Sequence, residues 1–228
     1  DSTLTGADAL EAAADRTGIF SGLDAKLTRQ PDLFIHYSTK AAADTGGIAT
    51  LSGQLNDGII DYKTIYDRGT NFGVVAIDNS SLTLVHEIGH LMGLSHSRRQ
   101  ADGYPISATF PWAVGYGLDS NFSTIMAYES AFDNASGMRF FSTPNRYCGG
   151  PGYTKTACGI EYSDLRSGAH SVKALKATAL QISGISNGLL PVIILEGDDP
   201  IYIPDIDYAS ELKAQALDRE DGDITSSI

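Results

Sequence analysis

Eleven residues with the sequence HEIGHLMGLSH, at positions 86–96, constrain this chain more than any other stretch. Residues four apart lie on the same face of an α-helix, about one turn apart, so His86 and His90 can direct two imidazoles at one point. Gly93 stands where a helix should end, because glycine adopts the left-handed backbone conformation without a Cβ penalty. The chain can then turn back and bring a third imidazole, that of His96, to the same point.

These residue types predict a metal centre. Three neutral imidazoles that leave a fourth coordination position open are typical of a catalytic zinc, whereas a structural zinc has four protein ligands. Glu87 directly follows the first histidine, where its carboxylate can hold a water. The short pattern H-E-x-x-H occurs by chance in surface helices, but the longer pattern also fixes the glycine and the third histidine. We therefore expect His86, His90 and His96 to bind Zn²⁺ and Glu87 to be catalytic.

The stretch resembles the zinc-binding motif of the metzincin clan of zinc endopeptidases. Metzincins have a later turn with a methionine under the zinc, and residues 123–128 (STIMAY) are similar to that turn. Residues 112–117 and 140–145 are similar to bacterial reprolysin-like and peptidyl-Asp-metallopeptidase-like enzymes. Ser97 is more similar to the residue in matrixins, because reprolysins commonly have aspartate there. The resemblance covers roughly residues 20–185.

The resemblance implies an α+β fold: a twisted, mostly parallel sheet with an antiparallel edge strand, a zinc-binding helix and a C-terminal helix. Met126 would form an apolar floor beneath the histidines. Tyr128 would either approach the zinc and stabilise an oxyanion or pack in the cleft wall. The edge strand would bind an extended substrate by β-augmentation, although an ordinary edge strand has the same sequence character. Its residues would be Gly47, Ile48, Ala49 and Thr50.

Two further segments could contact a substrate. Residues 129–147 would form the wall of the S1′ pocket, with Phe140 and Phe141 lining or supporting it. Arg98 and Arg99 follow the third histidine and could contact an acidic substrate side chain, or could simply be solvated.

Local patterns predict the other elements of the catalytic domain. Residues 5–17 have helical periodicity, with Thr5 as a possible N-cap. The β-branched and aromatic content of residues 33–37 and 72–77 predicts two strands. Residues 169–185 are amphipathic and predict the C-terminal helix.

Other candidate metal ligands are weaker. Asp57 or Asp61 could hold Ca²⁺, but no spaced carboxylate motif accompanies them, so a solvated loop is the simpler interpretation. His36 has no second ligand near it in the sequence, and we expect it to pack within a strand. His170 is expected to pack or to cap a helix.

Composition limits the class of protein. The 228-residue chain has a formal net charge of −12 and offers no basic face to nucleic acid. No run approaches the eighteen apolar residues of a membrane span. Cys148 and Cys158 lack the C-x-x-C spacing of a metal or redox pair and predict a disulfide in a secreted protein, or free thiols in a reducing compartment. The resemblance implies a secreted enzyme whose leader and propeptide precede Asp1.

The sequence divides into a catalytic domain at 1–186, a linker at 187–190 and a final segment at 191–228. The final segment resembles the opening half of a bacterial immunoglobulin-like module, but it is too short for a complete sandwich of roughly a hundred residues. We expect the chain to be a monomeric zinc endopeptidase acting on proteins or peptides. The alternatives are a zinc-binding, non-catalytic adhesion module and a zinc amidase acting on cell-wall peptides. Glu87 favours catalysis, because a binding module has no need of it.

Overall fold

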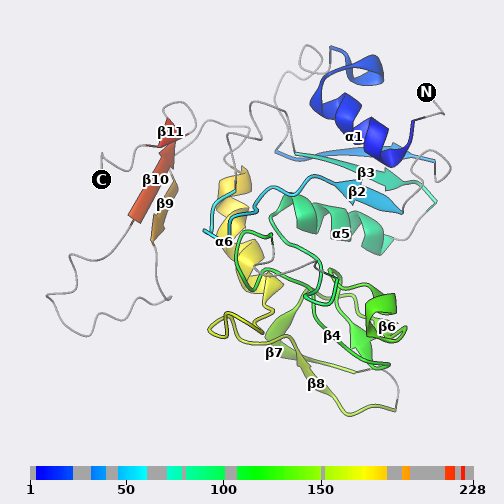
Figure 1. The fold of residues 1–228 in the computed structure, drawn as a ribbon, viewed down its shortest axis with the longest axis vertical. Coiled ribbons are helices and arrows are strands. Elements are labelled where there is room, and N and C mark those ends of the chain that lie inside the picture. Colours follow the sequence, from blue (N-terminus) through cyan, green and yellow to red (C-terminus); the bar gives the residue numbers. More distant parts are fainter. Residues whose placement is uncertain are drawn as a thin grey trace, which may run out of the picture.

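The computed structural model describes ten ranges of the chain, and Figure 1 shows how they are arranged. The described ranges are 4–22, 32–39, 46–60, 71–78, 81–100, 107–149, 152–183, 192–195, 214–218 and 222–223. No helix in these ranges is long and apolar enough to cross a membrane. Asp61 and the linker predicted at 187–190 lie outside the described residues.

The N-terminal sheet contains three strands in the order β1-β3-β2. β1 (Phe34–Ser38) pairs in parallel with β3 (Phe72–Ala76), and β2 (Gly47–Ala49) pairs with the other side of β3 in the antiparallel direction. Every residue of β3 is buried, which explains why its sequence FGVVA has no polar alternation. β2 is therefore an antiparallel strand at the edge of this sheet, and the N–H of Thr50 extends the pairing to the carbonyl of Phe72 over 3.0 Å.

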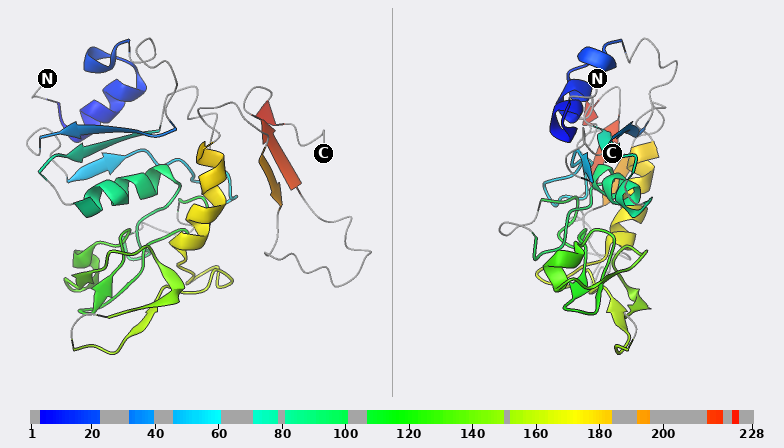
Figure 2. Two further views of the ribbon diagram at one scale, coloured as in Figure 1. Left: turned by 180° about the vertical axis from the view of Figure 1, so that it is seen from behind. Right: turned by 90° about the vertical axis from the view of Figure 1, so that its right-hand side faces the viewer.

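Helices cover both faces of this sheet (Figures 1 and 2). α1 (Gly6–Ala14) lies on one face and α5 (Ser81–Leu91) lies on the other. α1 begins with a capping box in which the Thr5 hydroxyl accepts from Asp8 N–H and the Asp8 carboxylate accepts from Thr5 N–H, so the predicted N-cap is confirmed. The helix ends at Ala14 rather than at residue 17, and a short 3₁₀ helix, η1 (Gly18–Phe20), follows it.

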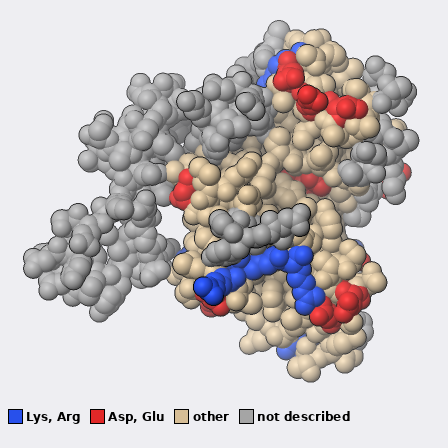
Figure 3. All heavy atoms as spheres, viewed as in Figure 1, with Lys and Arg blue, Asp and Glu red and all other residues tan. Residues whose placement is uncertain are grey.

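The polypeptide after α5 forms a second, irregular half with short strands (Figure 1). Its first small sheet has the order β4-β5-β6 and its second pairs β7 with β8. The elements are β4 (Gly117–Leu118), β5 (Phe122–Ser123), the 3₁₀ helix η2 (Glu129–Phe132), β6 (Ser136–Gly137), β7 (Thr143–Cys148) and β8 (Thr156–Cys158). In Figure 3 one group of acidic side chains on the visible face lies near α1, and a band of basic side chains crosses this second half.

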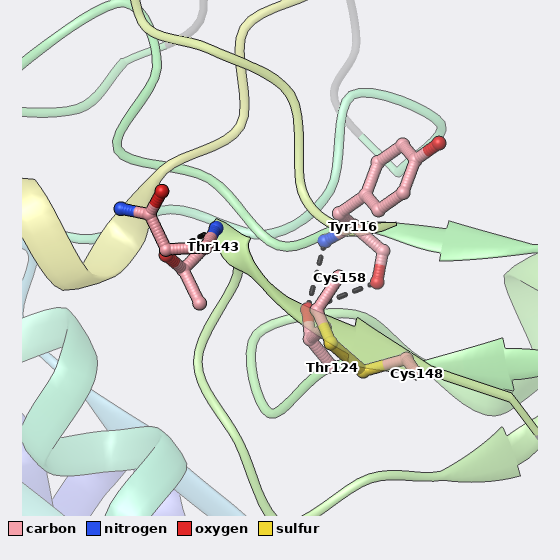
Figure 4. Close-up of a disulfide and its surroundings, with 6 residues drawn as sticks. Tyr116, Thr124, Thr143, Cys148 and Cys158 are labelled. Atoms are coloured by element: carbon pink, nitrogen blue, oxygen red, sulfur yellow. Dashed lines mark hydrogen bonds between the residues drawn. A yellow bond between two sulfur atoms is a disulfide. The ribbon is translucent and has the colours of Figure 1, made fainter. Parts of the chain in front are cut away.

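A disulfide joins β7 to β8 between Cys148 and Cys158, as predicted (Figure 4). Both cysteines are buried against Phe122 of β5. In the same region, the Thr124 hydroxyl accepts from the N–H of Tyr116 and donates to its carbonyl, each over 2.9 Å.

Replacing both cysteines by Ser should lower the free energy of unfolding by about 2–3 kcal/mol, because the unfolded chain gains the entropy of an open ten-residue loop. Urea denaturation of the zinc-loaded double variant measures this loss. A loss below about 0.5 kcal/mol would show that the crosslink restricts the unfolded chain far less than loop-closure entropy requires.

α6 (Ser171–Ser183) connects the two halves through polar contacts. The amide of Gln181 accepts from Ile60 N–H over 2.9 Å and donates to the carbonyl of Gly58 over 2.8 Å. The hydroxyl of Thr178 donates to the carbonyl of Met92, just beyond α5. These bonds connect the C-terminal helix to the backbone near the end of the histidine-bearing helix.

A small antiparallel sheet of β9 (Val192–Leu195), β10 (Ala214–Asp218) and β11 (Gly222–Asp223) lies to one side of α6 (Figures 1 and 2). Its strand order is β11-β10-β9. Its assignment as part of an immunoglobulin-like module stays a prediction.

Candidate active site

The end of α5 brings the third histidine back toward the first two. Gly93 has φ 83°, and its N–H donates to the carbonyl of His90 over 2.9 Å. Leu94 N–H donates to the carbonyl of Gly89, also over 2.9 Å. These two bonds form a Schellman motif, which ends the helix and reverses the chain toward His96. The predicted role of Gly93 is confirmed.

The three histidines converge on one point. The Nε2 atom of His96 lies 3.0 Å from Nε2 of His86 and 3.1 Å from Nε2 of His90. Among the described residues, this is the one group of three or more potential metal ligands. The histidine positions predicted from the motif are thus brought together.

Backbone carbonyls fix which nitrogen carries the proton in two of the rings. His86 Nδ1 lies 2.7 Å from the carbonyl oxygen of Ile125, and His90 Nδ1 lies 2.9 Å from that of Leu94. A carbonyl only accepts, so each Nδ1 donates and each Nε2 presents a lone pair to the shared point. Lone pairs facing each other at about 3 Å repel unless a cation lies between them. The donor set therefore fits Zn²⁺, which is bound by neutral imidazole nitrogens.

Burial also keeps these rings neutral. Desolvation, together with the neighbouring histidines, lowers the pKa of His90 to about 3 and that of His96 to about 4. Desolvation lowers the pKa of His86 as well, against the opposing effect of its bond to Ile125. The imidazoles are therefore ready to bind a metal at neutral pH without first losing protons.

Glu87 lies between the histidines and the edge strand. It is 4% exposed, and desolvation raises the pKa of its carboxyl group to about 7. A Cβ atom on Gly47 of β2 would lie 2.7 Å from Glu87 Oε1, so the glycine lets the strand pass directly over the carboxylate. A carboxyl group with a pKa near 7 can accept and release a proton at neutral pH.

Met126 and Tyr128 lie on two sides of the histidines. Met126 is fully buried, and a Cβ on Gly89 of α5 would lie 2.5 Å from its Sδ atom. Tyr128 is half exposed, and its ring centroid lies 4.6 Å from that of His96 and 5.6 Å from that of His86. Desolvation and the charge of Glu87 raise the pKa of Tyr128, so its hydroxyl stays protonated at neutral pH.

A cavity of about 540 Å³ opens beside the metal site. Its lining joins His86 and Glu87 of α5 to Gly46 and Gly47 at the edge strand. The opposite lining comes from residues 123–138, between β5 and the residue after β6. Phe140 and Phe141 are not in the lining: Phe140 packs near the disulfide and Phe141 packs against the core around Met126, so both support the wall.

The two arginines after the third histidine have internal partners. Arg98 donates to the carbonyls of Pro111 and Gly168 over 2.5 and 3.0 Å. Arg99 pairs with Asp119 and stacks over the ring of Phe132. Neither lines the cavity, and their suggested contact with an acidic substrate side chain stays a prediction. Both arginines connect loops that are distant in the sequence, and the sequence alone does not indicate such contacts.

Gln100 contributes to the site in a way that the sequence analysis missed. Its side-chain oxygen accepts from the Ser97 hydroxyl over 2.7 Å and from the N–H of Tyr128 over 2.9 Å. This connects the loop after His96 to the segment after Met126. No local motif indicates such a bond, because the partners are three and twenty-eight residues away.

The remaining candidate ligands have other roles. His36 packs edge-to-face against Phe20, with ring centroids 5.2 Å apart. His170 precedes α6, where its carbonyl accepts from Lys173 N–H. The Asp57 carboxylate accepts from Ile59 N–H in a local turn, and Ca²⁺ binding there stays a prediction.

Comparison with known proteins agrees with this geometry. The model of the metallopeptidase family M12 matches residues 5–142. The chain is 30% identical over 158 residues to the peptidyl-Asp metalloendopeptidase of Pseudomonas aeruginosa, a match that covers 64% of this chain and 25% of the relative. The chain thus spans about a quarter of that relative's length. A solved structure described as a chaperone–substrate complex shares the fold, with a TM-score of 0.52 and 18% identity, over 82% of this chain and 25% of that one. Because the family model spans more than half of the sequence, this chain belongs to the metallopeptidase family M12.

Proposed function

We propose that the chain is a secreted, zinc-dependent endopeptidase that hydrolyses peptide bonds in extended protein substrates. The observation that carries this proposal is the convergence of the Nε2 atoms of three histidines beside a buried carboxylate, at the edge of a sheet. His86, His90 and His96 would hold the zinc. Residues 1–186 would form the catalytic domain, acting as a monomer.

Glu87 would serve as the general base and then as the general acid. Its carboxylate would take a proton from the attacking water and pass it to the leaving amine. Its raised pKa, about 7, suits both steps, because the group is nearly half protonated at neutral pH. Zinc, when bound, would supply Lewis acidity toward the water and the scissile carbonyl.

The edge strand and Tyr128 would orient the substrate. Gly47, Ile48, Ala49 and Thr50 lie at the edge of the sheet next to Glu87, where a peptide could pair with β2 in register. Tyr128 keeps its proton at neutral pH, so its hydroxyl could donate to the developing oxyanion.

Chelation should abolish the activity. We expect the zinc-loaded chain to cleave casein and an internally quenched peptide library, and 1,10-phenanthroline to stop cleavage. Restoring Zn²⁺ in slight excess should restore the rate. Failure of the zinc-loaded protein to cleave any peptide in the library would contradict the proposal and favour the non-catalytic zinc-binding alternative.

Zinc affinity should depend only weakly on pH. Since the pKa values of His90 and His96 lie at about 3 and 4, these rings are already neutral at pH 5.5. The pKa of His86 is lowered from its ordinary value as well, because burial disfavours its charged form. Glu87, with a pKa of about 7, is then the main group that is protonated on acidification from pH 7.5 to 5.5, and the proton that it must release weakens zinc binding by about 30-fold. If all three imidazoles had the ordinary pKa of about 6.5, the same acidification would weaken zinc binding by about 1,000-fold.

Competition with a fluorescent zinc chelator at the two pH values measures this change. Glu87→Gln provides the control, because it removes the carboxyl group that titrates near pH 7 and should flatten the dependence further. A loss near 1,000-fold would show that the metal-free histidines titrate normally.

A further inference from the structure

The cavity beside the metal site carries negative charge and no positive side chain among the described residues. Its lining includes two carboxylates, those of Glu87 and Glu129, and no lysine or arginine. Apolar side chains of Leu82, Ile125 and Met138 form much of the remaining wall. A cavity with these walls is poorly suited to an acidic substrate side chain, although the relative from P. aeruginosa is named for peptidyl-Asp cleavage.

Glu129 has a defined position in this wall. It is the first residue of η2, directly after Tyr128. A Cβ atom on Gly137 of β6 would overlap Glu129 Oε1. The Glu129 carboxylate therefore lies directly against β6, in space that a side chain at position 137 would fill.

The nearby cation is already paired elsewhere. Arg99 donates to the carbonyl of Ala131 in the same 3₁₀ helix, but its guanidinium pairs with Asp119. The acidic groups that raise the pKa of Arg99 are Asp119 and Asp133, not Glu129. Among the described residues, no cation lies within ion-pair distance of Glu129. Its carboxylate therefore faces the cavity without a partner of opposite charge in the described part of the chain.

We propose that Glu129 makes this cavity select a long basic side chain, Lys or Arg, next to the scissile bond. This inference rests on the proposed peptidase function. The methylene stem of such a side chain would pack against Leu82, Ile125 and Met138, and its charged end would reach the Glu129 carboxylate. An aspartate would place a like charge near Glu129, and the described lining has no lysine or arginine to compensate for it.

Binding to a catalytically inactive variant tests the cavity separately from the reaction. The zinc-loaded Glu87→Gln chain would be titrated with fluorescent decapeptides that carry Lys, Gln or Asp at one position in turn. At one of the tested positions we expect the Lys peptide to bind at least about fivefold more tightly than the Asp peptide. An attraction of this size is what a single partly exposed carboxylate can provide. The preference should shrink in 0.5 M NaCl, because salt screens exposed charges.

Three variants in the Glu87→Gln background complete the experiment. Adding Glu129→Gln should remove the preference, and Glu129→Lys should reverse it toward Asp. Glu11→Gln removes the same single negative charge as Glu129→Gln, but at an exposed position on α1, and should leave the Lys preference intact. Unchanged zinc affinity would verify that each variant retains the site.

The outcomes separate the two claims. A Lys preference that disappears with Glu129→Gln supports the inference, even if the unmodified chain cleaves nothing and the peptidase proposal fails. Cleavage by the unmodified chain without any Lys preference, or with a preference that survives Glu129→Gln, overturns the inference and leaves the peptidase proposal standing. A preference for Asp in the Glu87→Gln chain also overturns it.

Discussion

Glu87→Gln should lower kcat/KM for peptide hydrolysis by about 10²–10⁴-fold and leave the zinc in place, because general acid–base catalysis contributes about that factor. Glutamine has nearly the same shape as glutamate, so β2 can still pass over it at Gly47. The amide, however, cannot accept a proton from the attacking water. Glu87→Ala should lose as much activity, since it also removes the proton acceptor.

The measurement pairs steady-state hydrolysis of a quenched peptide with zinc content by mass spectrometry. His90→Gln is the matched control, because it should lose zinc and activity together. Near wild-type turnover by zinc-loaded Glu87→Gln would exclude the carboxylate as the base. Loss of zinc from that variant would instead mean that Glu87 contributes to holding the metal.

The metal-ligand geometry was predictable because it depends on local spacing. A helix places His86 and His90 on one face, and a glycine at position 93 ends the helix. The structure adds that the Schellman bonds run from Gly93 and Leu94, and that the carbonyl of Leu94 also orients His90. All of these features lie within residues 86–96, so the positions of the metal ligands could be predicted without any distant part of the chain.

The partners from distant segments were not predictable in the same way. The carbonyl that orients His86 belongs to Ile125, and any residue type supplies a carbonyl there. For Arg98 and Arg99 the sequence favours a solvated loop over a substrate contact, whereas the structure places backbone carbonyls and Asp119 around them. The resemblance places Glu129 in the predicted pocket wall, but its close approach to Gly137 joins two segments that the sequence does not bring together.

The strands show the same difference between features that depend on local sequence and features that depend on distant segments. The apolar run of β3 predicted a buried strand from composition alone. The position of β2 at the sheet edge depends on the order β1-β3-β2, which a single sequence does not encode locally. The family resemblance implied the edge position of residues 47–50, because related chains share a fold more closely than they share residues, and the structure adds the order.

Gly93→Ala should lower the free energy of unfolding by about 2–5 kcal/mol and weaken zinc binding. A left-handed backbone costs a residue with a Cβ about 1–2 kcal/mol, and overpacking a buried site costs about 1–3 kcal/mol more. Gly93 has φ 83°, and a Cβ there would overlap the hydroxyl of Thr109 and lie 3.1 Å from Cδ1 of Ile60. The reversal that delivers His96 would have to shift to relieve this overlap.

Thr109→Ala separates the two causes. Its hydroxyl is buried without a hydrogen-bond partner among the described residues, so removing it alone should cost little. The double variant Gly93→Ala/Thr109→Ala should regain most of the stability lost to overlap and keep the loss due to backbone strain, although the Cβ of residue 109 and Cδ1 of Ile60 stay close to the new Cβ. Urea denaturation of the metal-free proteins measures both terms, and competition with a chelator measures zinc affinity. If Gly93→Ala alone matched the unmodified chain in both, the helix end would not be what positions His96, and the third ligand would have to be held by the loop that follows it.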